Sequence, residues 1–173
     1  MGADISAWQN FYLMAGSASA ALTGLIFVGL SMQARAIIAH PLFRDRALTS
    51  LQSLVAGVLL SAAVLVPGQS ALALGVEVGV VAAFFAGRIA HFAWLMRSVG
   101  ARTRRRPGGR WAIEWITWSL WLAVFVASAV ALAVGSSIGL FLLALAIVSM
   151  FALNVWNAWV LIEEVAAQPS VAR

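Results

Sequence analysis

The chain has 173 residues, of which 63% are hydrophobic and only 10% are charged, and its formal net charge is +5. A soluble domain is nearer half apolar and a quarter charged, so this composition places the chain among membrane proteins. The absence of cysteine excludes disulfides, thiolate metal sites and a cysteine nucleophile. The positive charge lies between long apolar runs, where it sets membrane orientation, so we expect no nucleic-acid partner.

Five apolar segments are long enough to cross a bilayer, which takes about 20 residues for a hydrocarbon core of about 30 Å. They predict helices at about residues 8–32, 48–66, 71–96, 111–134 and 138–165. We therefore expect an all-α integral membrane bundle of five transmembrane helices, forming a single domain over residues 1–173. The first segment follows Asp4 and no basic residue, which favours a retained helix over a cleaved signal peptide.

The connections between these segments differ in charge. Residues 33–47 and 97–110 contain arginines, whereas residues 67–70 and 135–137 are short and uncharged. Because arginine accumulates in cytoplasmic loops, the N-terminus is expected outside and the C-terminus in the cytoplasm. The chain contains 11 arginines and no lysine, which indicates a high-GC bacterium and its plasma (inner) membrane. The segment ARTRRRPGGR at 101–110 is expected to be a solvated loop or a contact with anionic lipid.

Several polar residues lie inside the predicted spans. Counting about 1.5 Å of rise per residue puts one group at similar depth in the cytoplasmic half of the membrane. This predicted polar layer consists of Gln52, Arg88, His91, Glu114, Asn154, Asn157 and Glu163. Glu77 lies near the opposite end of its helix and is expected at the outer surface.

An unpaired charge in hydrocarbon costs several kcal/mol, so Arg88 is expected to point into the bundle. Its expected partners are Asn157, Asn154 and Glu114. Three roles remain open for the polar layer: it cross-links helices, it forms a cavity for ions or protons, or it binds a lipid or small ligand. For His91 the choice is between a hydrogen-bonded packing residue and a proton relay.

Two further patterns concern packing. Gly16, Ala20 and Gly24 recur every four residues in the first segment, a spacing that lets two helix backbones approach closely. Among the aromatic residues, Trp8 and Tyr12 are expected to mark the outer membrane surface, whereas Trp121 is expected between helices.

The motifs of common enzymes do not occur. There is no GxSxG, HExxH or phosphate-binding loop, and no carboxylate pair has a useful spacing within a span. We expect no catalytic residue, no metal site and no cofactor. A bis-histidine haem would need histidines on two facing spans, and His91 is the only histidine within one.

Three stretches resemble a known family: AGSASAALTGLIFVGLSM at 15–32, HPLFRDRALTSLQSLVAGVLLSAAVLVPGQSALALGVE at 40–77, and NAWVLI at 157–162. The family comprises small five-helix integral membrane proteins of high-GC bacteria, sometimes labelled modulators of the membrane-anchored AAA protease FtsH. The resemblance implies that PGQS and the following GVE are family features, which places Glu77 close to an outer turn. It also implies regulation or interaction within the membrane rather than chemistry.

Two functions follow from these observations. The first is a non-enzymatic multi-pass membrane protein that acts through intramembrane helix–helix contacts, on a partner such as an AAA protease. The alternative is a small homo-oligomeric ion or proton channel or transporter that uses the polar layer. A pore would place Glu77, Arg88 or Gln52 on a shared axis. A partner-binding protein would pair these residues inside one subunit, leaving the face of Gly16, Ala20 and Gly24 for contact with a second copy or another membrane protein.

Overall fold

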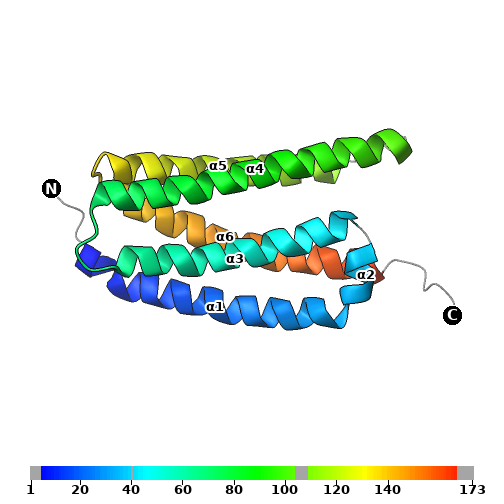
Figure 1. Ribbon diagram of the computed structural model, residues 1–173, viewed down its shortest axis with the longest axis horizontal. Helices are drawn as coiled ribbons and strands as arrows, with labels where there is room; N and C mark the ends of the chain where they lie inside the picture. The colour runs from blue at the N-terminus through cyan, green and yellow to red at the C-terminus, as the bar shows by residue number, and fades with distance from the viewer. Residues whose placement is uncertain (1–4, 40, 104–108, 167–173) are drawn as a thin grey trace.

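The computed structural model describes residues 5–39, 41–103 and 109–166 of the chain. Every element in these ranges is helical, as Figure 1 shows. The elements are η1 (Ile5–Trp8), α1 (Gln9–Met32), α2 (Ala34–Ala39), α3 (Pro41–Leu65), α4 (Ala71–Thr103), α5 (Gly109–Ala133) and α6 (Ile138–Ala166). Five of them, α1, α3, α4, α5 and α6, are long and apolar enough to cross a membrane. The predicted all-α fold with five spans is confirmed.

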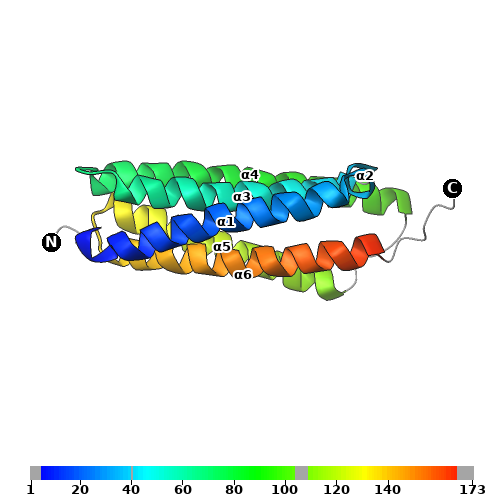
Figure 2. The same ribbon diagram turned by 90° about the horizontal axis from the view of Figure 1, so that it is seen from below.

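The long helices form a bundle in which helices that follow each other in the chain run antiparallel. α3, α4, α5 and α6 make a ring in which each helix contacts the next, and α1 lies outside the ring against α3 and, to a smaller extent, α6. Figures 1 and 2 show the long helices alternating in direction, so that α1 begins and α6 ends at opposite ends of the bundle. This arrangement agrees with an odd number of spans.

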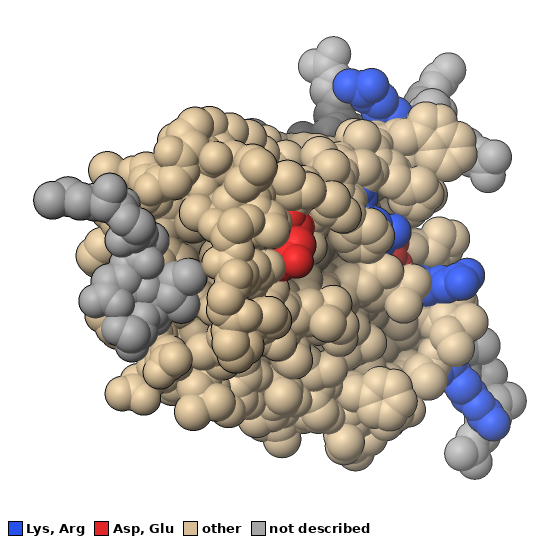
Figure 3. All heavy atoms as spheres, turned by 60° about the vertical axis from the view of Figure 1, so that its left-hand side comes forward, with Lys and Arg blue, Asp and Glu red and all other residues tan. Residues whose placement is uncertain are grey.

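The two ends of the bundle differ in charge. One end carries the turns at 66–70 and 134–137 and is called the short-turn end below. The other carries α2, the start of α3 and the end of α4, with Arg35, Arg44, Arg46 and Arg97, and is called the arginine end. Figure 3 brings the short-turn end forward and shows one small acidic area among uncharged side chains, with the arginines along the right-hand side.

Glycine makes both tight turns possible. Gly68 and Gly135 have φ values of 73° and 77°, in the left-handed region that glycine adopts without a Cβ penalty. After α5, the Ser136 amide donates to the Ala131 carbonyl and the Gly135 amide to the Leu132 carbonyl, both at 2.8 Å. This is the Schellman pattern, which satisfies the last carbonyls of a helix and reverses the chain.

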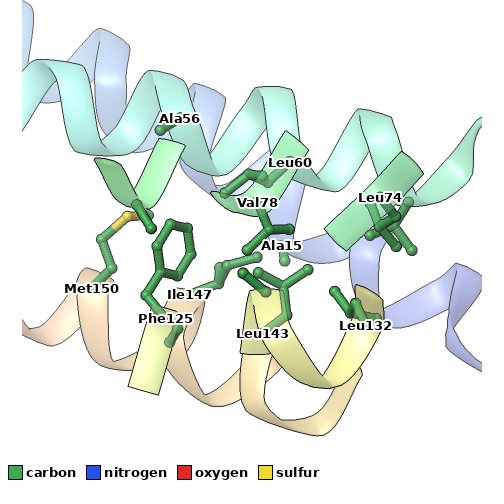
Figure 4. Packing of buried hydrophobic residues seen from close by; sticks show 14 of the residues in the cluster. Ala15, Ala56, Leu60, Leu74, Val78, Phe125, Leu132, Leu143, Ile147 and Met150 are labelled. Atoms are coloured by element: carbon green, nitrogen blue, oxygen red, sulfur yellow. The ribbon is translucent and has the colours of Figure 1, made fainter. Parts of the chain in front are cut away.

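The apolar core lies where the helices of the ring and α1 meet. Figure 4 shows side chains of neighbouring helices in contact there, among them Leu60, Val78, Phe125, Leu143 and Ile147. Trp121 is buried, as expected, and its indole nitrogen donates to the Ala146 carbonyl at 2.9 Å.

Tyr12, expected to mark the outer membrane surface, lies at the short-turn end, but its side chain points into the bundle rather than outward. Its side chain is 0% exposed, and its hydroxyl donates to the Leu140 carbonyl of α6 at 2.8 Å. A buried phenol requires such an acceptor, because an unpaired hydroxyl in an apolar environment is costly. Tyr12 therefore fastens α1 to α6 at the short-turn end.

The connection expected at 33–47 is largely helical. α2 occupies part of it, and α3 begins at Pro41 rather than near residue 48. Proline suits the first helical position because its missing amide hydrogen would have no partner there. α4 likewise continues to Thr103, beyond the expected end near residue 96. The earlier start of α3 puts Asp45 and Arg46 on a helix of the ring.

The small-residue face of α1 divides between two environments. A Cβ at Gly16 would lie 3.0 Å from the Ser61 Cβ, so Gly16 packs closely against α3. Ala20 and Gly24 are exposed, and a Cβ at Gly24 would meet no atom of the described chain within 4 Å. The close contact between α1 and α3 continues instead through Ser19 and Gly57.

Candidate functional site

Arg88 on α4 makes an ion pair with Asp45 on α3. The Arg88 Nη2 atom lies 2.7 Å from the Asp45 Oδ1 atom, and the two side chains are 18% and 8% exposed. Arg88 Nη2 also donates to the Thr49 hydroxyl at 2.8 Å and to the Asp45 carbonyl at 3.3 Å. Arg88 thus points into the bundle, as expected, but its partner is Asp45 rather than an asparagine.

Helical spacing explains why α3 presents this set of acceptors. Asp45 and Thr49 are four residues apart and share one face of α3. The Thr49 hydroxyl donates to the Asp45 carbonyl at 2.9 Å, which directs its lone pairs toward Arg88. The site therefore provides a carboxylate, a carbonyl and a hydroxyl for one guanidinium nitrogen.

The ion pair lies within the spans. Arg88 lies in the candidate span Ala71–Leu95, about 10 Å of helical rise before its end. Asp45 lies in the candidate span Pro41–Leu65, about 6 Å of helical rise after its start. At these depths the two opposite charges reduce each other's cost of leaving water.

His91 lies one helical turn after Arg88 on α4 and also contacts Asp45. Its Nδ1 atom lies 3.5 Å from the Asp45 Oδ1 atom, and its side chain is 52% exposed. Asp45 therefore has Arg88 on its buried side and His91 toward the surface of the bundle.

The two asparagines of α6 bind serines of α3. The Asn154 amide nitrogen donates to the Ser53 hydroxyl at 2.9 Å, and that of Asn157 to the Ser50 hydroxyl at 2.6 Å. Asn154 and Asn157 are three residues apart on α6, and Ser50 and Ser53 are three residues apart on α3. The two amides therefore share one face of α6, as expected. They fasten α6 to α3 next to the Asp45–Arg88 pair.

The other members of the predicted polar layer lie elsewhere. Gln52 is half-buried on α3, and its Oε1 atom accepts no hydrogen bond from the described chain. Glu163 is exposed and accepts a bond from the Trp159 indole at 2.8 Å. The side chain of Glu114 lies outside the described residues. Arg88, His91, Asn154 and Asn157 come together, whereas Glu163 lies apart from them.

Glu77 lies at the short-turn end, separate from this cluster. It is exposed and accepts a hydrogen bond from the Gln69 side-chain amide at 2.8 Å. Because Gln69 belongs to the turn before α4, the bond connects the turn to the first part of that helix. This contact gives Glu77 a role in holding the turn.

A cavity of about 60 Å³ adjoins the ion pair, between α3, α4, α5 and α6. Its polar side is formed by Asp45, Arg46, Thr49, Arg88 and Asn157. Its apolar side is formed by Phe85, Ile89, Phe92, Trp115, Trp118 and Trp121. One water molecule needs roughly 10–15 Å³ of such volume, so the cavity has room for more than one.

The sequence interpretation missed Asp45, Thr49, Ser50 and Ser53. Asp45 was expected in a connection because Arg44 and Arg46 flank it. The available signal was Pro41, which marks a helix start early enough to bring Asp45 into the bundle. The hydroxyl residues gave no comparable signal, because serine and threonine are common in transmembrane helices as small packing residues.

Fold and site together define a multi-pass α-helical membrane protein in which α3 and α4 of one chain form a charged cluster. Comparison of the sequence with protein-family models and curated proteins, and of the fold with solved structures, gives no match.

Proposed function

We propose that the protein is a non-enzymatic, multi-pass protein of the bacterial inner membrane that acts through helix–helix contacts with a membrane partner. The observation that carries this proposal is the Arg88–Asp45 pair at 2.7 Å. In a pore built from several copies, Arg88 would face a shared axis and meet water or passing ions. Here its charge is balanced by α3 of the same chain.

The partner is proposed to bind the outer face of α1. Only 11% of the apolar window of α1 is buried, compared with 44% for α3 and for α6. Ala20 and Gly24 on this face lack bulk, and a Cβ at Gly24 would have open space around it within the described chain. Small residues at this spacing permit the close backbone approach that drives helix association in lipid.

The proposed occupant is a transmembrane helix of a membrane-anchored AAA protease of the FtsH type. This choice rests on the resemblance of the stretches 15–32, 40–77 and 157–162 to the family labelled modulators of that protease. In the proposed orientation, the arginine end and the C-terminus lie in the cytoplasm, and the N-terminus lies outside.

The test is co-purification with FtsH from bacterial membranes that contain the tagged full chain. We expect Gly24→Leu to abolish co-purification, because leucine blocks close approach to α1. Gly87→Leu is the matched control, since Gly87 is also an exposed helical glycine with no described atom within 4 Å of a Cβ. Unchanged recovery of FtsH with Gly24→Leu would contradict the proposal, as would equal loss with Gly87→Leu.

One observation favours the alternative function, a proton channel or transporter. Asp45 contacts both Arg88 and the exposed His91, so titratable groups extend from the cavity to the surface of the bundle. Proton flux into liposomes measures this function directly. Flux that depends on Asp45 and is lost in Asp45→Asn would support the channel and contradict a purely partner-binding role.

A further inference from the structure

The cavity between α3, α4, α5 and α6 combines an aromatic wall with the Asp45–Arg88 ion pair. Phe85, Trp118 and Trp121 are among the residues of its apolar side, and the ion pair forms part of its polar side. Binding sites for small molecules typically join an apolar lining to a few polar groups that fix the orientation of the ligand. The cavity has this composition.

The ion pair uses only part of its hydrogen-bonding capacity. On Asp45, the Oδ1 atom contacts both Arg88 and His91, whereas the Oδ2 atom makes no hydrogen bond with the described chain. On Arg88, the Nη2 atom makes the bonds to α3, whereas the Nη1 atom makes none with the described chain. The pair therefore keeps one free acceptor and one free donor.

These two atoms are accessible to a small ligand. The Arg88 Nε atom is completely enclosed, but Asp45 Oδ2 and Arg88 Nη1 are not. Asp45 as a whole is only 7% exposed, so its free oxygen has little access to water except through the cavity that it lines. A poorly solvated polar atom without a partner is costly, and a ligand that pairs with it removes that cost.

The two free atoms select the charge class of the ligand. An anion would be attracted by Arg88 Nη1 but repelled by Asp45 Oδ2, and a cation would meet the reverse. A hydroxyl group is both a donor and an acceptor, so it can donate to the carboxylate and accept from the guanidinium. A neutral hydroxyl also leaves the charge balance of the ion pair unchanged.

The size and the opening of the cavity limit the rest of the ligand. Its volume of about 60 Å³ is well below the roughly 150 Å³ of a cavity that holds benzene. It can take a hydroxyl and the first carbons of a chain, but no ring. Ile89 and Phe92 of α4 and Trp115 and Trp118 of α5 line the cavity and are only half-buried, so the cavity reaches the surface of the bundle between these helices.

We propose that the cavity binds the hydroxyl end of a neutral membrane alcohol, whose apolar chain leaves between α4 and α5. The hydroxyl donates to Asp45 Oδ2 and accepts from Arg88 Nη1, and the aromatic side chains surround the first carbons. A free alkanol and the hydroxyl of a diacylglycerol share this chemistry. The site is separate from the α1 face that is proposed to bind a protein partner, so either proposal can fail alone.

The experiment uses a photoreactive alkanol, 3-azioctanol, with the purified full chain in neutral detergent. Its diazirine is on the third carbon, close enough to the hydroxyl to react inside the cavity. After irradiation, mass spectrometry of the peptides locates the label. We expect the label within residues 85–92 of α4 or 115–121 of α5, the stretches of these helices that line the cavity.

Competition on the unaltered chain tests which chemistry is recognised. An excess of 1-octanol or of dioctanoylglycerol should remove the label, and the one that acts at the lower concentration identifies a free alkanol or a diacylglycerol as the source of the hydroxyl. Octyl methyl ether keeps the chain and the acceptor but cannot donate to Asp45, so it should compete about tenfold less well or worse. Octanoate and octylammonium should also compete less well than 1-octanol, because each is repelled by one charge of the pair.

Two variants connect the label to the cavity. Ile89→Trp fills the cavity and should abolish labelling there. Ile116→Trp, at an exposed position of α5 outside the lining, should retain it. The unfolding midpoints of both variants show whether they are folded, and the competition series decides the question if Ile89→Trp is not.

Four results would overturn the proposal. Equal competition by octyl methyl ether would mean that the hydroxyl donor is not recognised. Stronger competition by octanoate or octylammonium would mean that the ligand is charged. Undiminished labelling in folded Ile89→Trp would place the alcohol elsewhere on the protein, and absence of label from the lining of the unaltered chain would mean that the cavity holds only water.

Discussion

Asp45 and Arg88 lie 43 residues apart in the chain and form an ion pair of 2.7 Å between α3 and α4. The pair lies at the arginine end of the bundle, within the candidate spans of both helices and, on α3, near the start of the span. The ion pair allows the apolar helix α4 to carry an arginine, because the Asp45 carboxylate and the Thr49 hydroxyl replace the water that the guanidinium loses.

Arg88→Met is expected to lower the free energy of unfolding by about 3 kcal/mol, because it leaves the buried Asp45 carboxylate without its countercharge. The value is at the lower end of the range for broken buried pairs, since the Arg88 side chain is 18% exposed. Chemical unfolding in detergent, followed by circular dichroism, measures it.

The double variant Asp45→Leu/Arg88→Met is the control for this change. Removing both charges should restore most of the lost stability, because an apolar pair of similar volume needs no compensation. A double variant less stable than Arg88→Met would show that the destabilisation does not come from a stranded charge.

Gly75→Ala is expected to destabilise the contact between α4 and α5. The added Cβ would lie 2.5 Å from the Ala133 backbone nitrogen and 2.8 Å from its Cα, so the two helix backbones must move apart. Such overpacking costs about 1–3 kcal/mol. Gly79→Ala, one turn further along α4, is the matched control, because its Cβ would lie 3.9 Å from the Ala129 Cβ. It should be neutral or slightly stabilising, since alanine favours helix over glycine. Equal unfolding midpoints for the two variants would contradict the close approach.

Gly16→Leu and Gly24→Leu are expected to differ in stability. Leucine at position 16 meets the Ser61 Cβ on α3 and should cost about 1–3 kcal/mol. Leucine at position 24 has open space in the described chain and should leave the unfolding midpoint unchanged or slightly raised. Loss of stability in Gly24→Leu would mean that its face is already occupied in the purified protein.

The orientation in the membrane is testable with single cysteines, since the chain has none of its own. Cysteine at Ser70 or Ser136, both at the short-turn end, should react in intact cells with a thiol reagent that does not cross the membrane. Cysteine at Thr103, at the arginine end, should react only after the cells are opened. Reaction of Thr103→Cys in intact cells would reverse the proposed topology.

The spans could be predicted from the sequence because their length and polarity are dictated by the bilayer. The start of α3 could not, because the charged stretch Arg44–Asp45–Arg46 has the composition of a loop, and only Pro41 indicates the helix. Asp45 was consequently assigned outside the membrane, and the partner of Arg88 was sought on other helices. Hydropathy measures how apolar a segment is, but it contains no information on whether two charges in different segments meet.

The amides of Asn154 and Asn157 were correctly expected on a shared face, since that follows from helical spacing alone. Their partners Ser50 and Ser53 depend on how α3 and α6 are rotated against each other. That rotation results from packing around the whole ring. Packing also explains why Gly16 contacts α3, whereas Ala20 and Gly24 at the same spacing on α1 do not.

The position of the ion pair has a consequence for biosynthesis. Asp45 and Thr49 precede the turn at 66–70, and Arg88 and His91 follow it, so all of them belong to one helical hairpin. The hairpin can close its pair before the ribosome has made α5 and α6. Two charged segments that enter the lipid together, already matched, avoid the cost that each would meet alone at the translocon. Membrane integration of α3 is therefore tied to the synthesis of α4, and a chain that ends before Arg88 would deliver Asp45 to the bilayer without its countercharge.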